Sequence, residues 1–203
     1  MANDHYFSVN PSSDTRERQI DVTLAGRSLT LTTAAGVFSP DGLDRGTRVL
    51  LGSVPPPAHD GALLDVGCGW GPIAITMALH SPDASVWGVD VNERVLGLAR
   101  ANAEAAGASN VTIALPDDVP DDLRFRTIWS NPPIRVGKDE LHEILLTWLP
   151  RLEVEGDAWL VVSKDLGGDS LQKWLVGALG AGFHVARAST DKGFRVIRVR
   201  RTA

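Results

Sequence analysis

The sequence predicts an α/β protein with a Rossmann-like, doubly wound and mostly parallel sheet of seven strands. Beyond residue 61, short apolar runs alternate with helix-like segments, as is typical of a sheet covered by helices on both faces. The last two runs are joined by a turn near residues 191–193, so we expect an antiparallel C-terminal edge strand. Expected strands span 62–66, 85–90, 110–114, 126–130, 157–163, 182–188 and 193–199, and expected helices span 71–80, 92–106, 138–151 and 168–179.

The first 60 residues differ from the rest of the chain. Residues 1–19 are polar, and two alternating runs, 20–24 and 29–32, flank a turn and predict a β-hairpin. A loop at 36–42, a short apolar segment and three consecutive prolines at 55–57 follow, the prolines acting as a stiff spacer. We therefore expect an N-terminal extension with the hairpin over 1–60 and the main α/β domain over 61–203.

Composition limits the class of protein. The single cysteine, Cys68, excludes an intrachain disulfide, and no apolar run approaches the roughly 20 residues that span a bilayer. The first residues lack the pattern of a secretion signal, so we expect a cytoplasmic monomer or homodimer away from membranes. The histidines show no ligand spacing with cysteines or acids, so no metal site is expected.

The net charge of −5 is not that of a strong nonspecific nucleic-acid binder, but the last stretch of the chain is basic. Two interpretations are open: these side chains face a phosphate backbone, or they are solvated charges that protect an edge strand from aggregation. The stretch contains Arg187, Lys192, Arg195, Arg198, Arg200 and Arg201 against the single acid Asp191.

A glycine-rich turn is the strongest local signal. An apolar strand ends at Asp65 and is followed by Gly67, Cys68, Gly69 and Gly71, after which a helix begins. Such glycines let a ligand approach the main chain closely, although some glycine-rich turns are merely tight turns. A dinucleotide fingerprint needs its third glycine where this chain has Pro72, which favours S-adenosylmethionine over a pyrophosphate. Asp65 is expected near the cationic amino end of that cofactor.

The next two strands end in further candidate cofactor residues. Asp90 lies 23 residues beyond Gly67, close to the spacing at which an acid accepts hydrogen bonds from ribose hydroxyls. Val91 follows it and is assigned to the same site. Asp117, after the third strand, is a candidate acceptor for the adenine amino group, or else part of a solvated acidic turn.

Asn131 and Pro132 follow the fourth strand, at the sheet edge where open α/β proteins place ligands. The lone pair of an exocyclic amine is delocalised into its ring and is poorly nucleophilic. The Asn131 side-chain oxygen and the Pro132 carbonyl supply two acceptors for the amine hydrogens, so the nitrogen can attack the sulfonium methyl. Positioning and electrostatics would then supply most of the acceleration. Asn131 is also expected to contact the cofactor.

With these residues the chain resembles the amino-directed class I methyltransferases, and in particular the small methyltransferase domain family. That family includes ribosomal RNA guanine 2-amino methyltransferases. The resemblance implies S-adenosylmethionine at the glycine turn, Asp90 and Asp117, the target amine at Asn131 and Pro132, and a loop over the cofactor at 36–39. The matching segments are residues 5–7, 36–39, 65–71, Asp90, 131–138 and 192–195.

The substrate side is expected around Phe38, Pro133, Ile134, Arg135 and Lys138. The last two flank the proposed pocket and are candidates for phosphate contact, although Lys138 is also placed to pair with acids at the start of its helix. Ile134 stands where many amino-methyltransferases stack an aromatic ring on a flipped base. The best-known ribosomal members carry a second domain, whereas we expect a single methyltransferase domain in these 203 residues.

Four functional classes follow. The first choice is methylation of an amino group on structured RNA, namely a guanine in ribosomal RNA or a ribosomal subunit. The alternatives are a protein glutamine amide, a small-molecule amine, and a non-catalytic cofactor-binding module. The intact Asp65, Asp90, Asn131 and Pro132 count against the last.

Overall fold

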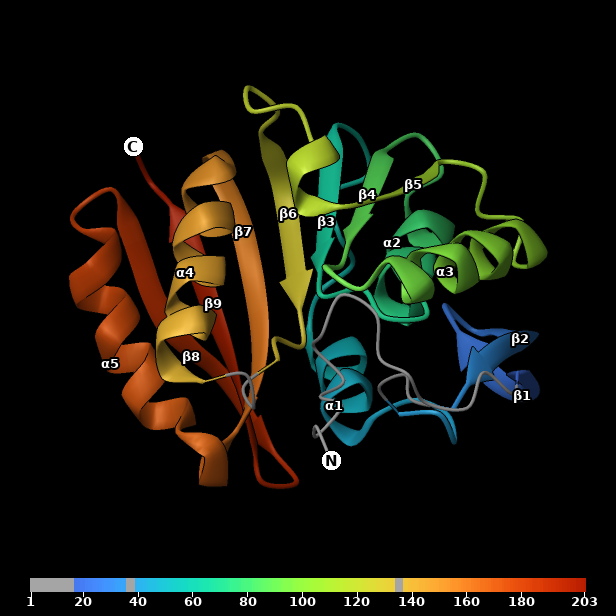
Figure 1. Ribbon diagram of the computed structural model, residues 1–203. Coiled ribbons are helices and arrows are strands. Elements are labelled where there is room, and N and C mark those ends of the chain that lie inside the picture. Colours follow the sequence, from blue (N-terminus) through green and yellow to red (C-terminus); the bar gives the residue numbers. More distant parts are fainter. Residues whose placement is uncertain (1–16, 36–38, 134–136) are drawn as a thin grey trace, which may run out of the picture.

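The computed structural model describes residues 17–35, 39–133 and 137–203 (Figure 1). Three of the predicted substrate residues, Phe38, Ile134 and Arg135, lie outside the described residues, as does most of the loop predicted to fold over the cofactor. No helix in the described ranges has the length and apolar character needed to cross a membrane.

Seven strands form one sheet in the order β5-β4-β3-β6-β7-β9-β8 (Figure 1). Neighbours from β5 to β7 are parallel, whereas β9 is antiparallel to both β7 and β8. The predicted seven-stranded, doubly wound fold and its antiparallel C-terminal pair are confirmed, with β8 outermost. The strands are β3 (Ala62–Val66), β4 (Ser85–Val89), β5 (Val111–Ala114), β6 (Phe125–Ser130), β7 (Leu152–Ser163), β8 (Phe183–Asp191) and β9 (Phe194–Arg201).

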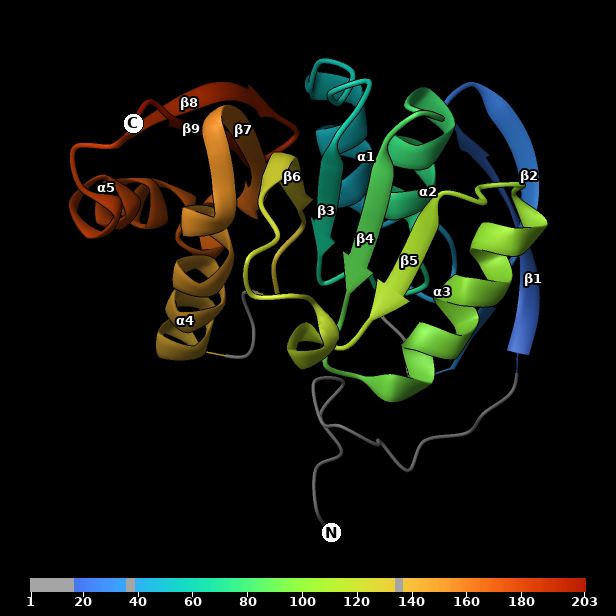
Figure 2. The same cartoon turned by 90° about the horizontal axis from the view of Figure 1, so that it is seen from above.

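Helices cover both faces of the sheet (Figure 2). Apolar side chains of α1, α2 and α3 pack on one face, and those of α4 and α5 pack on the other. Residues 138–151, predicted as one helix, divide into α4 and the 3-10 turn η3, where Pro150 has no N–H to continue the α-helical bonds. The helices are α1 (Arg45–Ser53), α2 (Pro72–His80), α3 (Glu93–Ala105), α4 (Lys138–Trp148) and α5 (Gly168–Leu179), with 3-10 turns η1 (Pro116–Asp118), η3 (Leu149–Arg151) and η4 (Lys164–Leu166).

Alternation along the strands divides the core into two layers. On β7, Trp159 and Val161 face the α1 side, whereas Leu160 and Val162 face α4 and α5. This period of two is what a strand buried on both faces requires. Trp159 is buried in the layer on the α1 side.

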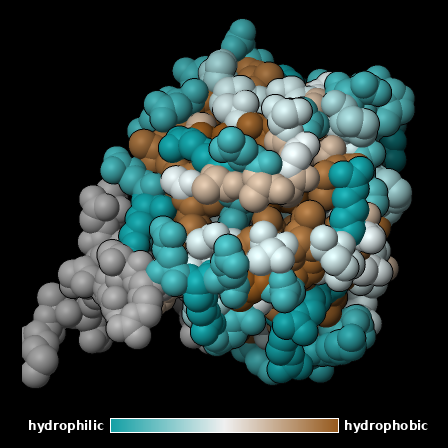
Figure 3. Space-filling view, turned by 90° about the vertical axis from the view of Figure 1, so that its right-hand side faces the viewer, coloured by the Kyte–Doolittle hydropathy of each residue, from teal (hydrophilic) through white to brown (hydrophobic). Residues whose placement is uncertain are grey.

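The N-terminal hairpin comprises β1 (Glu17–Leu24) and β2 (Arg27–Ala34), joined by a two-residue turn in which Ala25 and Gly26 both have positive φ. It packs beside α3, on the side of the molecule shown in Figure 3, where hydrophobic residues lie between hydrophilic ones. The side chain of Asn102 on α3 accepts a hydrogen bond from the Thr32 amide and donates one to the Thr32 carbonyl. The hairpin thus shares a core with the sheet domain, and the division at residue 60 stays a prediction.

The segment after the hairpin contains a helix that the sequence analysis did not predict. Residues 47–51 were expected only as a short apolar segment, whereas α1 runs from Arg45 to Ser53. Asp44 caps it, because its carboxylate accepts hydrogen bonds from the amides of Gly46 and Thr47. The helix packs against β7 and β9 on one face of the sheet.

Candidate active site

The glycine-rich turn lies directly after β3. Gly67, Gly69 and Gly71 all have positive φ, which explains the alternate glycines, because side-chain-bearing residues rarely adopt that conformation. The amides of Gly67 and Cys68 both donate to the Val89 carbonyl at 2.9 Å, so the turn is fixed to the end of β4. Gly71 precedes Pro72, the first residue of α2. The turn is therefore rigid and leaves its main chain open to a ligand.

Asp65 is buried and half-satisfied. One oxygen, Oδ2, accepts a hydrogen bond from the Ala74 amide at 3.0 Å, whereas Oδ1 has no partner among the described residues. Desolvation raises the pKa of this carboxyl to about 8; the Ala74 amide opposes the rise, and the nearby Asp90 carboxylate adds to it. A buried acceptor without a donor is costly and calls for a partner that arrives from outside the chain. The positively charged amino group of S-adenosylmethionine fits this requirement.

Asp90 follows β4 and is held by two backbone amides. Its Oδ2 accepts from Gly69 and its Oδ1 from Asn92, each at 3.0 Å. A carboxylate has about four acceptor sites, so capacity remains for ribose hydroxyls. Asn92 caps α3, because its side chain accepts a hydrogen bond from the Arg94 amide at 3.1 Å. Val91, between them, is 43% exposed, which leaves an apolar surface for a ligand ring at this edge.

Asp117 lies on η1, beyond β5 and next to the end of β4. It is exposed, and no hydrogen bond fixes its side chain among the described residues. The structure thus brings Asp117 to the same edge of the sheet as Asp90, while its predicted contact with adenine stays a prediction.

Asn131 follows β6, the strand next to β3, so it lies beside the glycine turn. The Ser130 hydroxyl donates to the Val66 carbonyl at 2.7 Å and so joins the end of β6 to the end of β3. The Nδ2 atom of Asn131 donates to Asp44 Oδ2 at 2.8 Å and to Thr47 Oγ1 at 3.1 Å. Among the described residues, nothing donates to Asn131 Oδ1. One acceptor is therefore left over for a ligand.

A surface pocket joins the two halves of this site. Its lining combines the glycine turn with Asn131 and with residues from the start of α1, which places the cofactor candidates beside the amine-binding candidate. The lining residues are Ser39, Asp44, Thr47, Gly67, Cys68, Gly69, Trp70, Pro72, Ile73 and Asn131. Pro132 is buried, and Pro133 lies close to the open side of Gly67. Asp65, Asp90 and Asp117 lie outside the lining of this pocket.

Two other predictions concern side chains around the pocket. Burial raises the pKa of the Cys68 thiol, which agrees with a packing rather than a nucleophilic role. Lys138 is exposed at the first position of α4, and the structure gives it no ion pair with the acids that follow it. His142, on the same helix, stacks on Trp174 of α5 with ring centroids 3.5 Å apart, so it connects the two helices.

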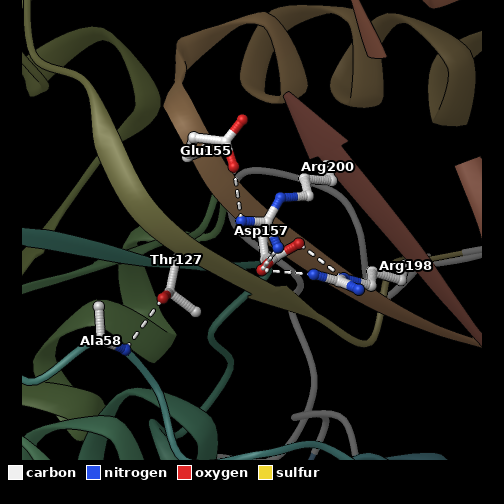
Figure 4. Close-up of polar contacts among 6 residues, drawn as sticks. All are labelled: Ala58, Thr127, Glu155, Asp157, Arg198 and Arg200. Atoms are coloured by element: carbon white, nitrogen blue, oxygen red, sulfur yellow. Dashed lines mark hydrogen bonds and ion pairs between the residues drawn. The ribbon is translucent and has the colours of Figure 1, made fainter. Parts of the chain in front are cut away.

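The C-terminal arginines do not form the basic edge that the sequence suggested. β9 is an inner strand, and three of its four arginines pair with acids of the same domain, two of them shown in Figure 4. The fourth, Arg201, donates to backbone carbonyls. Arg198 makes two hydrogen bonds to Asp157, at 2.7 and 3.0 Å, and Arg200 binds Glu155 at 2.8 Å. Arg195 binds Asp169 in the same way, at 2.9 and 3.4 Å. The edge-strand interpretation was wrong for these three side chains, because β9 is an inner strand. Internal carboxylates already bind them, and their contact with a phosphate backbone stays a prediction.

Sequence reasoning missed three residues that shape the site. Asp44 and Thr47 hold the Asn131 amide, and Asn102 donates to the Trp70 carbonyl within the glycine turn, at 2.9 Å. The aspartate two residues before Gly46 and three before Thr47 is a helix-start signal that predicts α1. Nothing local predicts contacts that span 84 to 87 residues.

Comparison of the sequence with known proteins agrees with this site. Residues 28–198 match the family described as methyltransferase small domain. The chain is 37% identical over 170 residues to the uncharacterized protein YbxB of Bacillus subtilis, covering 82% of this chain and 85% of that protein. It is 39% identical over 110 residues to ribosomal RNA small subunit methyltransferase C of Klebsiella pneumoniae, which covers 54% of this chain and 32% of that enzyme.

Among solved structures, the fold resembles the Thermus thermophilus 16S rRNA N2 G1207 methyltransferase, determined in complex with AdoMet and guanosine. The TM-score is 0.73 at 21% identity, and the match covers 95% of this chain. The chain spans about half the length of that protein and about a third of the length of the Klebsiella enzyme. The family match, the glycine turn and the buried Asp65 agree, and the chain belongs to the methyltransferase small domain family of S-adenosylmethionine-dependent methyltransferases.

Proposed function

We propose that this chain transfers a methyl group from S-adenosylmethionine to an exocyclic amino group of a guanine in ribosomal RNA. One observation carries the proposal. The Asn131 amide uses its two N–H bonds on Asp44 and Thr47 and keeps Oδ1 without a described donor, beside the glycine turn. An acceptor held in this way suits a substrate that arrives with N–H bonds to donate.

The chemistry of an aromatic amine explains the need for such acceptors. The Asn131 Oδ1 and the Pro132 carbonyl would each accept one amine hydrogen, which favours a nitrogen whose lone pair is directed at the methyl donor. Prolines at 132 and 133 stiffen the loop, so the acceptors are in place before the substrate arrives. No strong general base is required, since the nitrogen loses its proton only after it has gained the methyl group.

Each candidate cofactor residue would bind a different part of S-adenosylmethionine. Asp65 would bind the amino group of its methionine moiety, the Gly67–Gly71 turn would lie against it, Asp90 would bind the ribose, and Val91 and Asp117 would contact the adenine. When bound, this cofactor supplies an electrophilic methyl group on a sulfonium.

The RNA assignment rests on the names of relatives and on one charge. The Klebsiella and Thermus proteins to which the chain is similar are ribosomal RNA methyltransferases. Lys138 stands in the first turn of α4, where the helix dipole disfavours a cation, and it has no ion pair among the described residues. A phosphate group beside the target base would compensate for that placement. We assign Pro133, Ile134, Arg135 and Phe38 to the same substrate side.

Transfer of labelled methyl tests the proposal. Ribosomal subunits, naked ribosomal RNA and total protein from a strain that lacks this chain are incubated with the purified protein and labelled S-adenosylmethionine. We expect label in ribosomal RNA, and digestion of that RNA to nucleosides should give an N2-methylated guanosine. The Asn131→Ala variant should bind the cofactor nearly as tightly as the unaltered chain and lose transfer on the order of a hundredfold.

The other substrate classes are distinguishable outcomes of this assay. Label in a protein that survives ribonuclease would replace the RNA assignment with a glutamine amide. Label confined to small molecules would indicate an amine metabolite. Equal loss of cofactor binding and transfer in Asn131→Ala would refute the role of that residue as the acceptor for the target amine.

A further inference from the structure

We propose that Asp44 and Thr47, at the start of α1, are positioning residues that set the direction of the Asn131 amide. The inference deepens the proposed function, since it explains why Asn131 presents an oxygen rather than an NH2 group to the substrate. It makes α1, which precedes the glycine turn in the chain, the second half of the amine-binding site.

The direction of the Asn131 amide follows from which of its neighbours can donate and which can only accept a hydrogen bond. A carboxylate only accepts, so the group of Asn131 that faces Asp44 Oδ2 at 2.8 Å must be its NH2. The second proton of that NH2 is directed to Thr47 Oγ1 at 3.1 Å. With both protons used, Oδ1 is the group left for a ligand. The reversed amide would turn two donors toward an amine that also donates.

The carboxylate itself is held in place by the helix that it caps. Asp44 Oδ2 accepts from the Gly46 amide at 2.7 Å and from the Thr47 amide at 3.3 Å, as well as from Asn131. Rotating the carboxylate away from Asn131 would therefore uncap α1, at a cost of about 1 kcal/mol. The helix start and the amide direction are coupled through one oxygen atom.

Gly46 provides the space for this arrangement. A Cβ at this position would lie 2.9 Å from Asp44 Oδ2, 3.1 Å from Asn131 Oδ1 and 3.2 Å from Asn131 Nδ2. Its φ is not in the left-handed region, so the main chain here suits alanine as well as glycine. The glycine is needed because the amide lies against its Cα. An alanine at 46 should displace both the amide and the capping oxygen of Asp44, while its higher helix propensity offsets part of the weakened cap.

Three substitutions test the proposal. Gly46→Ala should lower kcat on the order of a hundredfold by displacing the amide, with a small change in the Kd for S-adenosylmethionine. Asp44→Ser keeps an equally good helix cap but withdraws the acceptor by one bond, and it should lower kcat by a similar factor. Asp44→Asn keeps both cap and acceptor, so it should restore much of the turnover that Asp44→Ser loses.

The same helix supplies a matched control. Gly52 also lies on α1, and a Cβ there would meet nothing within 4 Å. Gly52→Ala should leave kcat, KM and cofactor binding unchanged and raise the melting temperature slightly. A Gly46→Ala variant that melts near the unaltered chain yet turns over slowly would show displacement of the amide rather than loss of the fold.

A second readout does not depend on the substrate. The side-chain NH2 of Asn131, assigned in the NMR spectrum by its disappearance in Asn131→Ala, should show slowed hydrogen exchange in the unaltered chain and faster exchange in Asp44→Ser. Fast exchange in the unaltered chain would overturn the proposal. Transfer lost in Asn131→Ala but normal in Gly46→Ala and Asp44→Ser would also overturn it and leave the proposed function standing, whereas transfer that survives Asn131→Ala would refute that function.

Discussion

The edge of the sheet at the ends of β3 and β6 differs from the charged face of β7 and β9 in how many of its polar atoms are paired. At the first, Asp65 Oδ1 and Asn131 Oδ1 have no donor among the described residues. At the second, both oxygens of Asp157 are bound by Arg198, and Arg200 lies between Asp157 and Glu155 (Figure 4). Both regions hold polar or charged side chains on neighbouring strands, yet the first has acceptors without a donor and the second has its carboxylates paired.

The difference separates binding residues from structural ones. An acceptor buried without a donor weakens the fold by about 1–3 kcal/mol, so its presence at the glycine turn indicates a ligand that completes it. Charges that are paired within the fold attract an external phosphate less strongly than an unpaired charge does. Residue type alone does not make this distinction, because a binding aspartate and a structural aspartate cannot be told apart in the sequence. The hydrogen-bond partners of each side-chain atom make it.

The largest effect is expected at Asp65. Its pKa is raised to about 8 by desolvation, with the Ala74 amide opposing and Asp90 adding to the rise. The free folded protein therefore holds a proton that the unfolded chain releases near its ordinary value of 3.8. The stability associated with this proton is fully present below that value and is lost as the pH rises through about 8, a difference on the order of 5 kcal/mol.

Asp65→Asn should remove this loss and weaken cofactor binding at the same time. The amide oxygen still accepts from Ala74, so unfolding of the free variant in urea at pH 9 should need a higher free energy than that of the unaltered chain. Calorimetric titration should show that the affinity for S-adenosylmethionine falls on the order of a hundredfold, since a charged hydrogen bond is lost. A variant that is less stable at pH 9, or one that binds the cofactor normally, would contradict the assignment.

The next effect is expected at Asp157, in the paired region. Asp157→Ala leaves Arg198 and Arg200 without their shared carboxylate, and Arg198 also stacks over Trp159, 5.4 Å from its ring centre. The Arg198 and Asp157 side chains are 33% and 23% exposed, so water compensates part of the loss. We expect the free energy of unfolding to fall by about 1–2 kcal/mol. Urea titration measures this change.

The affinity for the cofactor serves as the control measurement for Asp157→Ala. The affinity for S-adenosylmethionine should match that of the unaltered chain, because Asp157 lies level with Thr127, near the start of β6, rather than at its end beside Asn131. Thr127 accepts a hydrogen bond from the Ala58 amide and so joins the residues after the proline spacer to the sheet (Figure 4). A large loss of cofactor affinity in Asp157→Ala would mean that the two regions are coupled.

The sequence was informative wherever the cause was local. Most strand and helix positions followed from apolar periodicity, although β7 begins at Leu152 rather than at the predicted 157. The positions of Asp65, Asp90 and Asn131 followed from their place at or just after the ends of parallel strands. The positive φ of the three glycines agrees with their spacing. These features depend on neighbours within a few residues, so one sequence suffices to predict them.

The rest depended on contacts between distant residues. The arginines of β9 meet carboxylates of β7 and α5 that lie 26 to 45 residues earlier, and only the antiparallel pairing with β7 brings Arg198 and Arg200 to theirs. Asp44 meets Asn131 across 87 residues. The short α1 was missed because its apolar residues are few, although its cap could have been recognised. Charge clusters were therefore overinterpreted, and the supporting residues of the site were underinterpreted.

The smallest effect is expected at Arg200. This variant tests whether a charge that is paired within the fold contributes to RNA binding. The side chain is 34% exposed and its partner Glu155 is 66% exposed, so Arg200→Ala should cost about 0–1 kcal/mol of stability. Because its charge is already paired, the slope of log affinity for ribosomal RNA against log salt should stay unchanged. Lys138 has no described ion pair, and Lys138→Ala should reduce that slope by about 1.

Filter binding of a ribosomal RNA fragment between about 50 and 200 mM salt measures both slopes under the same conditions. Each variant removes one positive charge, so the two have the same net charge and differ only in where the charge stood. A salt slope that falls equally in both variants would mean that paired arginines still attract the phosphate backbone. In that case pairing within the fold would not distinguish structural charges from RNA-binding ones. A slope reduced in Lys138→Ala alone would indicate that this RNA meets the protein at the start of α4 and not at β9.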